Sequence, residues 1–154
     1  MSLSIRPAVA DDCSTLVSFN QALAESTEGK VLDAERLSAG IRSVLADLSR
    51  GRYLVAEWDG RPAGCLMLTR EWSDWRNAWF WWIQSVYVAE SARRKGVYGA
   101  LHERVVSEAK DAGDVCGLRL NVEHHNAGAK ATYRSVGMGP GPYELYEVEI
   151  AVAL

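Results

Sequence analysis

The sequence predicts a single α/β (α+β) domain with a mixed, mostly antiparallel central sheet of about six to seven strands and helices on both faces. Three observations lead to this prediction. The 154 residues are enough for one domain with its own core, and no repeat, low-complexity tract or linker divides residues 1–154. Segments with a two-residue apolar period alternate with segments of helical period. Two apolar runs flank Asp59-Gly60, a typical hairpin turn.

The N-terminal part of the chain predicts one strand followed by two helices. Residues 4–9 alternate briefly and form the first strand, near an edge or a bulge because Pro7 cannot donate to a ladder. Asp11 or Asp12 then caps a helix. A second amphipathic helix begins at about Asp33.

The rest of the chain predicts five more strands and two helices. The strands are the hairpin pair 52–58 and 61–71, an aromatic-rich run at 77–89, residues 116–123, and the alternating tail 143–154. The helices run from Val97 to about Gly113 and from Asn126 to about Gly137, where a glycine is a plausible C-cap.

Composition and charge exclude several classes of protein. The net charge of −3 and the pI near 5.6 argue against a nucleic-acid binder or an anionic-membrane binder. Cys13, Cys65 and Cys116 lie far apart without a C-x-x-C pair, which indicates reduced, mostly buried thiols and no zinc site. No signal-peptide pattern and no membrane-spanning run is present, so we expect a cytoplasmic protein.

The stretch RRKGVYGA has the composition of an anion-binding elbow. Arg93, Arg94 and Lys95 precede Gly96, and a helix begins at the next residue. The first amides of a helix have no intrahelical partner and carry the positive end of its dipole. The alternative is a solvated basic loop before an ordinary helix. The P-loop pattern and G-x-G-x-x-G are both absent here.

Residues 86–105, VYVAESARRKGVYGALHERV, resemble the acetyl-CoA pyrophosphate motif of the GNAT superfamily of N-acetyltransferases. That motif runs strand, Q/R-x-x-G-x-G/A, helix. Arg93 and Gly96 match it, whereas Tyr98 occupies a position that usually holds Gly or Ala, and a glycine follows at Gly99. Tyr98 must therefore point away from the phosphates or stack on another part of the cofactor.

A second segment, NAGAKATYRSVGM, resembles the N-x-x-A-x-x-x-Y-x-x-x-G-F segment of the same superfamily. Asn126, Ala129, Tyr133 and Gly137 match in register, and Met138 replaces the usual aromatic residue. One helix and one strand separate the two motifs, as in that family. Two matched motifs at this distance are more specific than either alone.

The resemblance implies a fold, a cofactor and the residues that bind it. The sheet would be splayed between its fourth strand, at 82–89, and its fifth, at 117–123. Acetyl-CoA would lie in the split and leave as CoA, without a metal. The implied cofactor-binding residues are Val86, Tyr87 and Val88 through their backbone, Arg93, Arg94, Lys95, Gly96, Val97, Tyr98 and Gly99 at the pyrophosphate, and Asn126, Ala129 and Tyr133.

The implied reaction is direct attack of a neutral primary amine on the thioester. A strand amide near Tyr87 or Val88 would polarise the carbonyl, and Tyr133 would act as the general acid. Without the motif, Tyr133 would be interpreted as a packing residue. The acceptor would be a small molecule, or alternatively a protein or peptide. A non-catalytic acyl-CoA sensor is a third interpretation.

Carboxylates are the candidates for the base that takes the proton of the amine. Glu71 and Asp74, near the end of the third strand, come first, and Glu25 and Glu28, in the connection between the two N-terminal helices, come second. The alternative for each of them is a solvated surface carboxylate.

Aromatic side chains crowd the same region. Trp72 and Trp75 could form, with the neighbouring carboxylates, a wall for a cationic amine, or the tryptophans could serve core packing and a possible homodimer. Gln84 and Ser85 stand in the fourth strand, where polyamine-acetylating relatives often carry acidic residues.

The histidines do not predict a metal site. The pair His124-His125 has no third ligand at a suitable spacing. His102 is expected to be a partly exposed surface residue.

Overall fold

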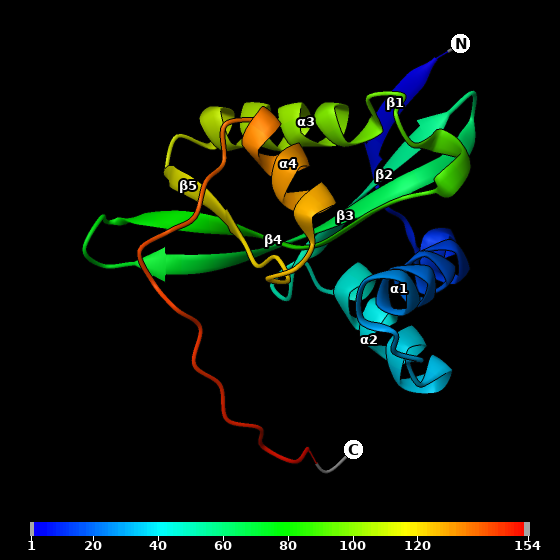
Figure 1. Cartoon of the computed structure of the whole chain (residues 1–154), viewed down its shortest axis with the longest axis horizontal. Helices are drawn as coiled ribbons and strands as arrows, with labels where there is room; N and C mark the ends of the chain where they lie inside the picture. Colours follow the sequence, from blue (N-terminus) through cyan, green and yellow to red (C-terminus); the bar gives the residue numbers. More distant parts are fainter. Residues whose placement is uncertain (1, 153–154) are drawn as a thin grey trace.

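A computed structural model describes residues 2–152, and its centre is a twisted five-stranded sheet (Figure 1). The strands follow one another across the sheet in sequence order: β1 Leu3–Pro7, β2 Arg52–Trp58, β3 Arg61–Ser73, β4 Ala78–Val88 and β5 Val115–Leu120. The first four pair antiparallel, and β5 pairs parallel to β4. The mixed sheet and the α+β class are confirmed.

Helices cover both faces of the sheet, as predicted. They are α1 Cys13–Glu28, α2 Ala34–Ala46, α3 Val97–Ala112 and α4 Ala127–Ser135, with 3₁₀ turns η1 Ala10–Asp12 and η2 Glu90–Ala92. Figure 1 shows α1 and α2 on one side of the sheet and α3 with α4 on the other. The N-terminal helix pair packs on β2, on β3 and on the end of β4, where the ring centres of Phe19 and Tyr87 are 5.2 Å apart, and it leaves the same face of β5 and of the start of β4 more open.

Short-range chemistry explains where two of these elements begin and turn. The Asp33 carboxylate accepts a hydrogen bond from the Arg36 amide and caps α2, which begins where the sequence predicts. Asp59 and Gly60 have φ values of 50° and 78°, which is the left-handed geometry of a tight hairpin turn.

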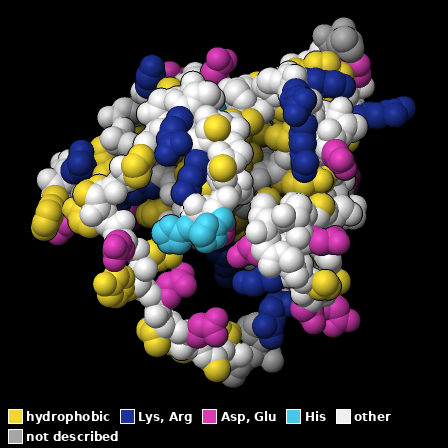
Figure 2. Space-filling view, in the orientation of Figure 1, with side chains coloured by type: hydrophobic (Ala, Val, Ile, Leu, Met, Phe, Trp, Pro, Cys, Tyr) yellow, Lys and Arg dark blue, Asp and Glu magenta, His cyan; other side chains and the backbone are white. Residues whose placement is uncertain are grey.

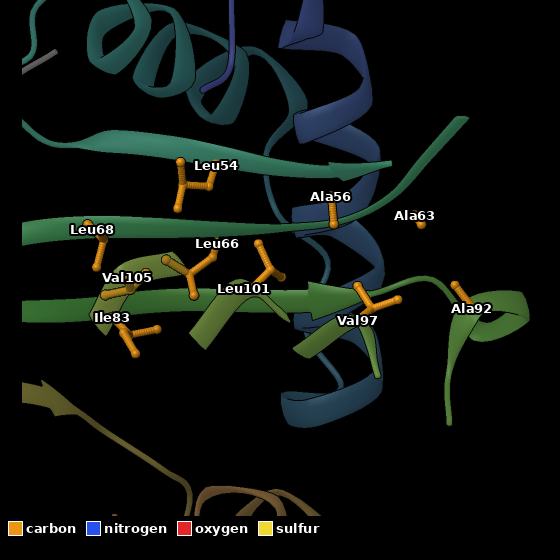
Figure 3. Packing of buried hydrophobic residues seen from close by; sticks show 10 residues of the cluster. All are labelled: Leu54, Ala56, Ala63, Leu66, Leu68, Ile83, Ala92, Val97, Leu101 and Val105. Carbon is orange, nitrogen blue, oxygen red and sulfur yellow. The ribbon is translucent and has the colours of Figure 1, made fainter. Parts of the chain in front are cut away.

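The interior consists of two apolar clusters, one on each face of the sheet. The cluster under α3 joins sheet residues such as Leu54, Leu66 and Ile83 to Leu101 and Val105 of the helix (Figure 3). The cluster on the other face packs α1 and α2 against β2 and β3. The loop and helix that follow β4 are therefore held by a core that spans the whole sheet.

A bulge in β4 ends its pairing with β5. Met67 of β3 lies opposite Ser85 and Leu68 lies opposite Ile83, so Gln84 is an extra residue on β4. The parallel pairing with β5 runs only as far as Ile83 opposite Leu120. Because a bulge bends a strand and increases its twist, the two strands diverge beyond this point, and the sheet is splayed between its fourth and fifth strands.

The prediction of six to seven strands is wrong for this chain, which has five among the described residues. Residues 143–152 were expected to form the last strand, but they are an exposed extended segment without a ladder partner; residues 153 and 154 of that predicted strand lie outside the described residues. A strand needs a neighbour as well as an alternating pattern. His102 is also buried, not partly exposed, and its ring lies beside that of Tyr98, with the ring centres 5.9 Å apart.

Two further expectations concern thiols and membranes. Cys65 is buried, Cys13 is half-buried and Cys116 is exposed, and none forms a disulfide. No helix within residues 2–152 is long and apolar enough to cross a membrane. The cytoplasmic location stays a prediction.

Candidate active site

The open edge of β4 is the central feature of the site. Residues 85–88 pair with β3 on one side and follow the bulged residue Gln84, and no strand of the described residues lies on their other side. Their backbone groups on that side are available to a ligand that adds like an extra strand. Val86, Tyr87 and Val88, which the sequence predicts as backbone contacts, lie on this edge.

The loop that follows β4 turns sharply into α3. Arg94 and Gly96 have positive φ values of 61° and 79°, and Gly96 is the N-cap of α3. A positive φ is uncommon outside glycine and is usually maintained by the surrounding structure. The first turn of α3, with Val97 to Gly99, contains no acidic residue. The free amides of this turn therefore face no local negative charge.

Two of the three predicted cations of the loop are tied to the domain. Arg93 donates from Nε to the Val88 carbonyl over 3.1 Å, and its guanidinium lies 5.9 Å from the centre of the Tyr87 ring. The Lys95 ammonium lies 5.2 Å from the centre of the Trp58 ring. Arg94 is exposed. Arg93 thus connects the loop to the last residue of the open edge.

Tyr98, the departure from the motif, packs against α4. Its ring centre is 5.5 Å from that of Tyr133 in an edge-to-face arrangement, and its hydroxyl is 3.5 Å from Nδ1 of His102. Burial, and then the neighbouring Tyr133, raise the pKa of Tyr98. Burial lowers the pKa of His102, which favours the neutral form of the imidazole. The bulky side chain therefore joins α3 to α4.

Tyr133, the predicted general acid, is half-buried on the last turns of α4. Burial raises its pKa, which keeps the phenol protonated at neutral pH. Asn126 is the N-cap of α4, and its Oδ1 accepts a 3.0 Å hydrogen bond from the Ala129 amide. The amide NH₂ of Asn126 has no partner in the cap and is left for a ligand, while Ala129 is part of the cap.

The uncovered face of β3–β5 carries a polar network that the sequence does not reveal. Glu71 Oε1 accepts 2.9 Å hydrogen bonds from Trp82 Nε1 and from Arg119 Nη1. The guanidinium of Arg119 also lies 3.5 Å from the centre of the Phe80 ring. Beside this network, the Gln84 amide donates to Thr69 Oγ1 over 2.7 Å. Glu71 and Gln84, both predicted substrate residues, thus share one face.

The other predicted acceptor residues lie apart from this network. Trp72 is on the opposite face from Glu71, where it packs edge-on against Trp79. Asp74 and Trp75 form the tip of the β3–β4 hairpin, and Trp75 is 92% exposed. The structure therefore does not assemble a wall from these four neighbours.

The two N-terminal carboxylates also lie apart from the network. Glu25 and Glu28 are exposed on the last turn of α1 and not in the connection, and Glu28 pairs with Lys30 at 3.6 Å.

One buried polar atom marks the start of the open edge. The Ser85 hydroxyl is buried and has no hydrogen-bond partner among the described residues. Unpaired buried hydroxyls are rare in folded proteins, and each requires an explanation. The residues here fit the predicted cofactor: an unpaired strand edge for amides, a hydroxyl without a partner at the start of that edge, and a basic loop at a helix N-terminus for phosphates. The described residues contain no group of three His, Cys, Asp or Glu side chains able to hold a metal ion.

Sequence reasoning missed Arg119, Trp82 and Thr69. These side chains form hydrogen bonds with partners that lie 11 to 48 residues away in the chain. The polar pair Gln84-Ser85 inside an apolar strand was the one available signal for the bulge.

The family is decided by comparison with known proteins. The model of the acetyltransferase (GNAT) family matches residues 18–138, which include the open edge, the loop and Tyr133. The chain belongs to the GNAT family. A crystal structure of a possible acetyltransferase from Clostridium difficile 630 is 41% identical, with a TM-score of 0.91 over 99% of this chain and 100% of that one.

More distant GNAT structures share the fold alone. The aminoglycoside N-acetyltransferase AAC(6′)-Iy in complex with CoA is 12% identical, with a TM-score of 0.79 over 97% of this chain and 96% of that one. The ribosomal-protein-alanine N-acetyltransferase from Brucella melitensis biovar Abortus 2308 is 15% identical, with a TM-score of 0.77 over 97% and 100%. A search of the curated proteins found no match.

Proposed function

We propose that this GNAT protein transfers an acetyl group from acetyl-CoA to a primary amine of a small molecule by direct attack. The observation that carries the proposal is the open edge of β4 at residues 84–88, which runs into the positive-φ loop and the N-terminus of α3. Bound acetyl-CoA would supply the activated acetyl group. CoA, which would leave as the product, is the ligand named for a structure that shares this fold.

The chain would hold the cofactor mainly through its backbone. Val86 and Tyr87 would offer edge groups to the pantetheine amides, since the Val88 carbonyl already accepts from Arg93. The amides and cations of residues 93–99 would take the pyrophosphate. The Asn126 NH₂ group would contact the pantetheine arm from the start of α4.

Tyr133 would supply the proton that the departing sulfur needs. Its pKa is raised by burial, so the phenol is fully protonated when the amine attacks. The phenol would donate from its O–H to the sulfur, and an amide of β4 near Tyr87 would polarise the carbonyl oxygen.

The acceptor would lie on the uncovered face beside Gln84. Here the charge of Glu71 is balanced by Arg119. This pairing weakens the attraction for a polycation and favours a small amine with few charges. Glu71 stays our first candidate for the base, acting through water.

The test is calorimetry with acetyl-CoA, followed by a thiol-release screen over polyamines, amino acids, aminoglycosides and peptides. We expect binding of acetyl-CoA and thiol release with at least one small amine. Absence of binding would show that the cofactor assignment is wrong. Binding without thiol release for any acceptor would favour a sensor, and release with peptides alone would favour a protein acetyltransferase.

A further inference from the structure

Residues 143–152, here called the C-terminal arm, expose an unusual amount of apolar surface. Six large apolar side chains on the arm are between 65% and 88% exposed: Tyr143, Leu145, Tyr146, Val148, Ile150 and Val152. No hydrogen bond of the described residues joins the arm to the domain. In Figures 1 and 2 the arm extends away from the body, with apolar and acidic side chains spaced along it. Apolar surface of this size normally marks an interaction site.

The arm has the pattern of a strand with two different faces. The pattern holds over residues 146–152: Tyr146, Val148, Ile150 and Val152 fall on one side of an extended chain, and Glu147 and Glu149 fall on the other. The ten residues contain no proline, lysine or arginine, the residues that commonly protect an edge strand from pairing.

The sheet offers an edge that matches both faces of the arm. β5 is an outer strand, and its edge away from β4 has no strand partner among the described residues. The other outer strand, β1, carries Pro7, whereas β5 has no such protection. On the α3 face, Leu118 packs into the core cluster; on the opposite face, Arg119 carries a positive charge.

A hollow lies beside this edge. It has a volume of about 150 Å³ and is lined by Val106, Ala109 and Lys110 of α3 and by residues 115–118 of β5. An added strand would place its apolar face over this hollow and its glutamates on the side of Arg119. Shape and polarity thus agree with the same orientation of the arm.

We infer that the arm adds as a strand to β5 of a second copy of this chain, in a reciprocal exchange that forms a two-fold symmetric dimer. The hinge before the arm favours a second copy over the arm's own domain. Residues 139–142 read Gly-Pro-Gly-Pro, and each proline keeps itself and the residue before it extended. Such a hinge projects the arm outward and disfavours the tight reversal that pairing with its own β5 requires. Because every copy has the same free edge on β5, a two-fold rotation lets each arm pair with β5 of the other copy.

The first test is the molar mass of the full chain in solution by light scattering. We expect a dimer for the wild type and a monomer for the double variant Val148→Lys/Ile150→Lys, whose substituted residues are both exposed. The matched control Val31→Lys changes an equally exposed residue between α1 and α2 and should stay dimeric. A monomeric wild type would overturn the inference, and so would a dimer that persists in the double variant.

The second test uses the exposed thiol of Cys116 on β5 to identify whose edge the arm occupies. Single cysteines placed at Tyr146, Val148 or Ile150, in a Cys13→Ser background, should form a disulfide with Cys116 at one of these positions. We expect a covalent dimer on a non-reducing gel, lost when Cys116→Ser is added. A cross-linked monomer would show that the arm closes on its own domain, and the absence of any Cys116 cross-link would show that β5 is not its partner. Neither test uses acetyl-CoA. Both can therefore be interpreted even if the proposed acetyltransferase function is wrong.

Discussion

The two halves of β4 differ in one respect, the number of strands beside them. Residues 79–83 lie between β3 and β5, whereas residues 85–88 pair with β3 alone, and the bulged residue Gln84 separates the two halves. The apolar character of the strand continues across the boundary, and only Gln84 and Ser85 interrupt it. The first half therefore contributes mainly to stability. The second half is where a ligand can use the backbone, because the bulge at Gln84 separates it from β5.

The largest effect is expected from a pair of substitutions across this boundary. Ile83 is 3% exposed in the core under α3, so Ile83→Ala should lower the free energy of unfolding by about 3 kcal/mol. Ser85→Ala removes a hydroxyl that has no protein partner and should change stability by less than about 0.5 kcal/mol. Denaturant unfolding measures both.

The affinity for acetyl-CoA, measured by calorimetry, should show the opposite order for Ile83→Ala and Ser85→Ala. Ser85→Ala should weaken binding, and Ile83→Ala should leave it largely intact at temperatures where the protein is folded. Equal losses of stability in the two variants would contradict the division of β4 into a structural half and a binding half.

Tyr133→Phe tests the chemistry assigned to the open half. The substitution keeps the ring and its contact with Tyr98 but removes the proton donor. We expect turnover to fall about 100-fold, the low end of the range for a general acid, with the affinity for acetyl-CoA unchanged. The measurement is steady-state thiol release with the best acceptor from the screen. Unchanged turnover would remove the role assigned to Tyr133.

The cofactor side of the site could be predicted from the sequence because its parts are local. A glycine before a helix, a run of cations and a tyrosine on a short helix each act within a few residues of the chain. Arg93, Gly96 and Asn126 accordingly stand at the element ends where the motifs placed them.

The acceptor side could not be predicted in the same way, because it depends on register between distant strands. Glu71 meets Arg119 across 48 residues, and Trp72 faces away from Glu71 simply because neighbouring strand residues alternate. The bulge at Gln84 likewise follows from how β3 and β4 pair. The arm shows the same limit, since its pattern is that of a strand but no sequence pattern states which edge it joins.

Substitutions of Tyr98 test whether its packing holds Tyr133, the proposed general acid, in position. Tyr98→Ala removes the ring that packs on Tyr133 and should lower kcat about tenfold, or about 1.4 kcal/mol, by loosening α4 against α3. Tyr98→Phe keeps the ring and loses only the long contact with His102, so it should retain most activity. Stopped assays at saturating acetyl-CoA separate kcat from binding. Equal losses in both variants would assign the effect to the hydroxyl, not to packing.

The smallest expected effect is a pH dependence of stability that comes from Cys65, a buried residue beside the open half of β4. Cys65 of β3 lies opposite Tyr87 and is 2% exposed, and burial raises the pKa of its thiol from 9.0 to about 12. The unfolded chain therefore loses this proton first, so the stability present below pH 9 is lost as the pH rises from 9 toward 12.

Between pH 8 and pH 10 the free energy of unfolding should fall by about 1 kcal/mol more in the wild type than in Cys65→Ala. Tyr53, whose pKa is raised from 10.0 to about 12 by burial and then by the neighbouring Cys65, acts mainly above this window in both proteins. Guanidinium unfolding at pH 8, 9 and 10 measures the two slopes. A steeper fall of the free energy of unfolding with pH in the wild type than in Cys65→Ala would mean that no water reaches Cys65, although the edge of β4 beside it is open. An equal fall in the two proteins would mean that water reaches Cys65 under Tyr87.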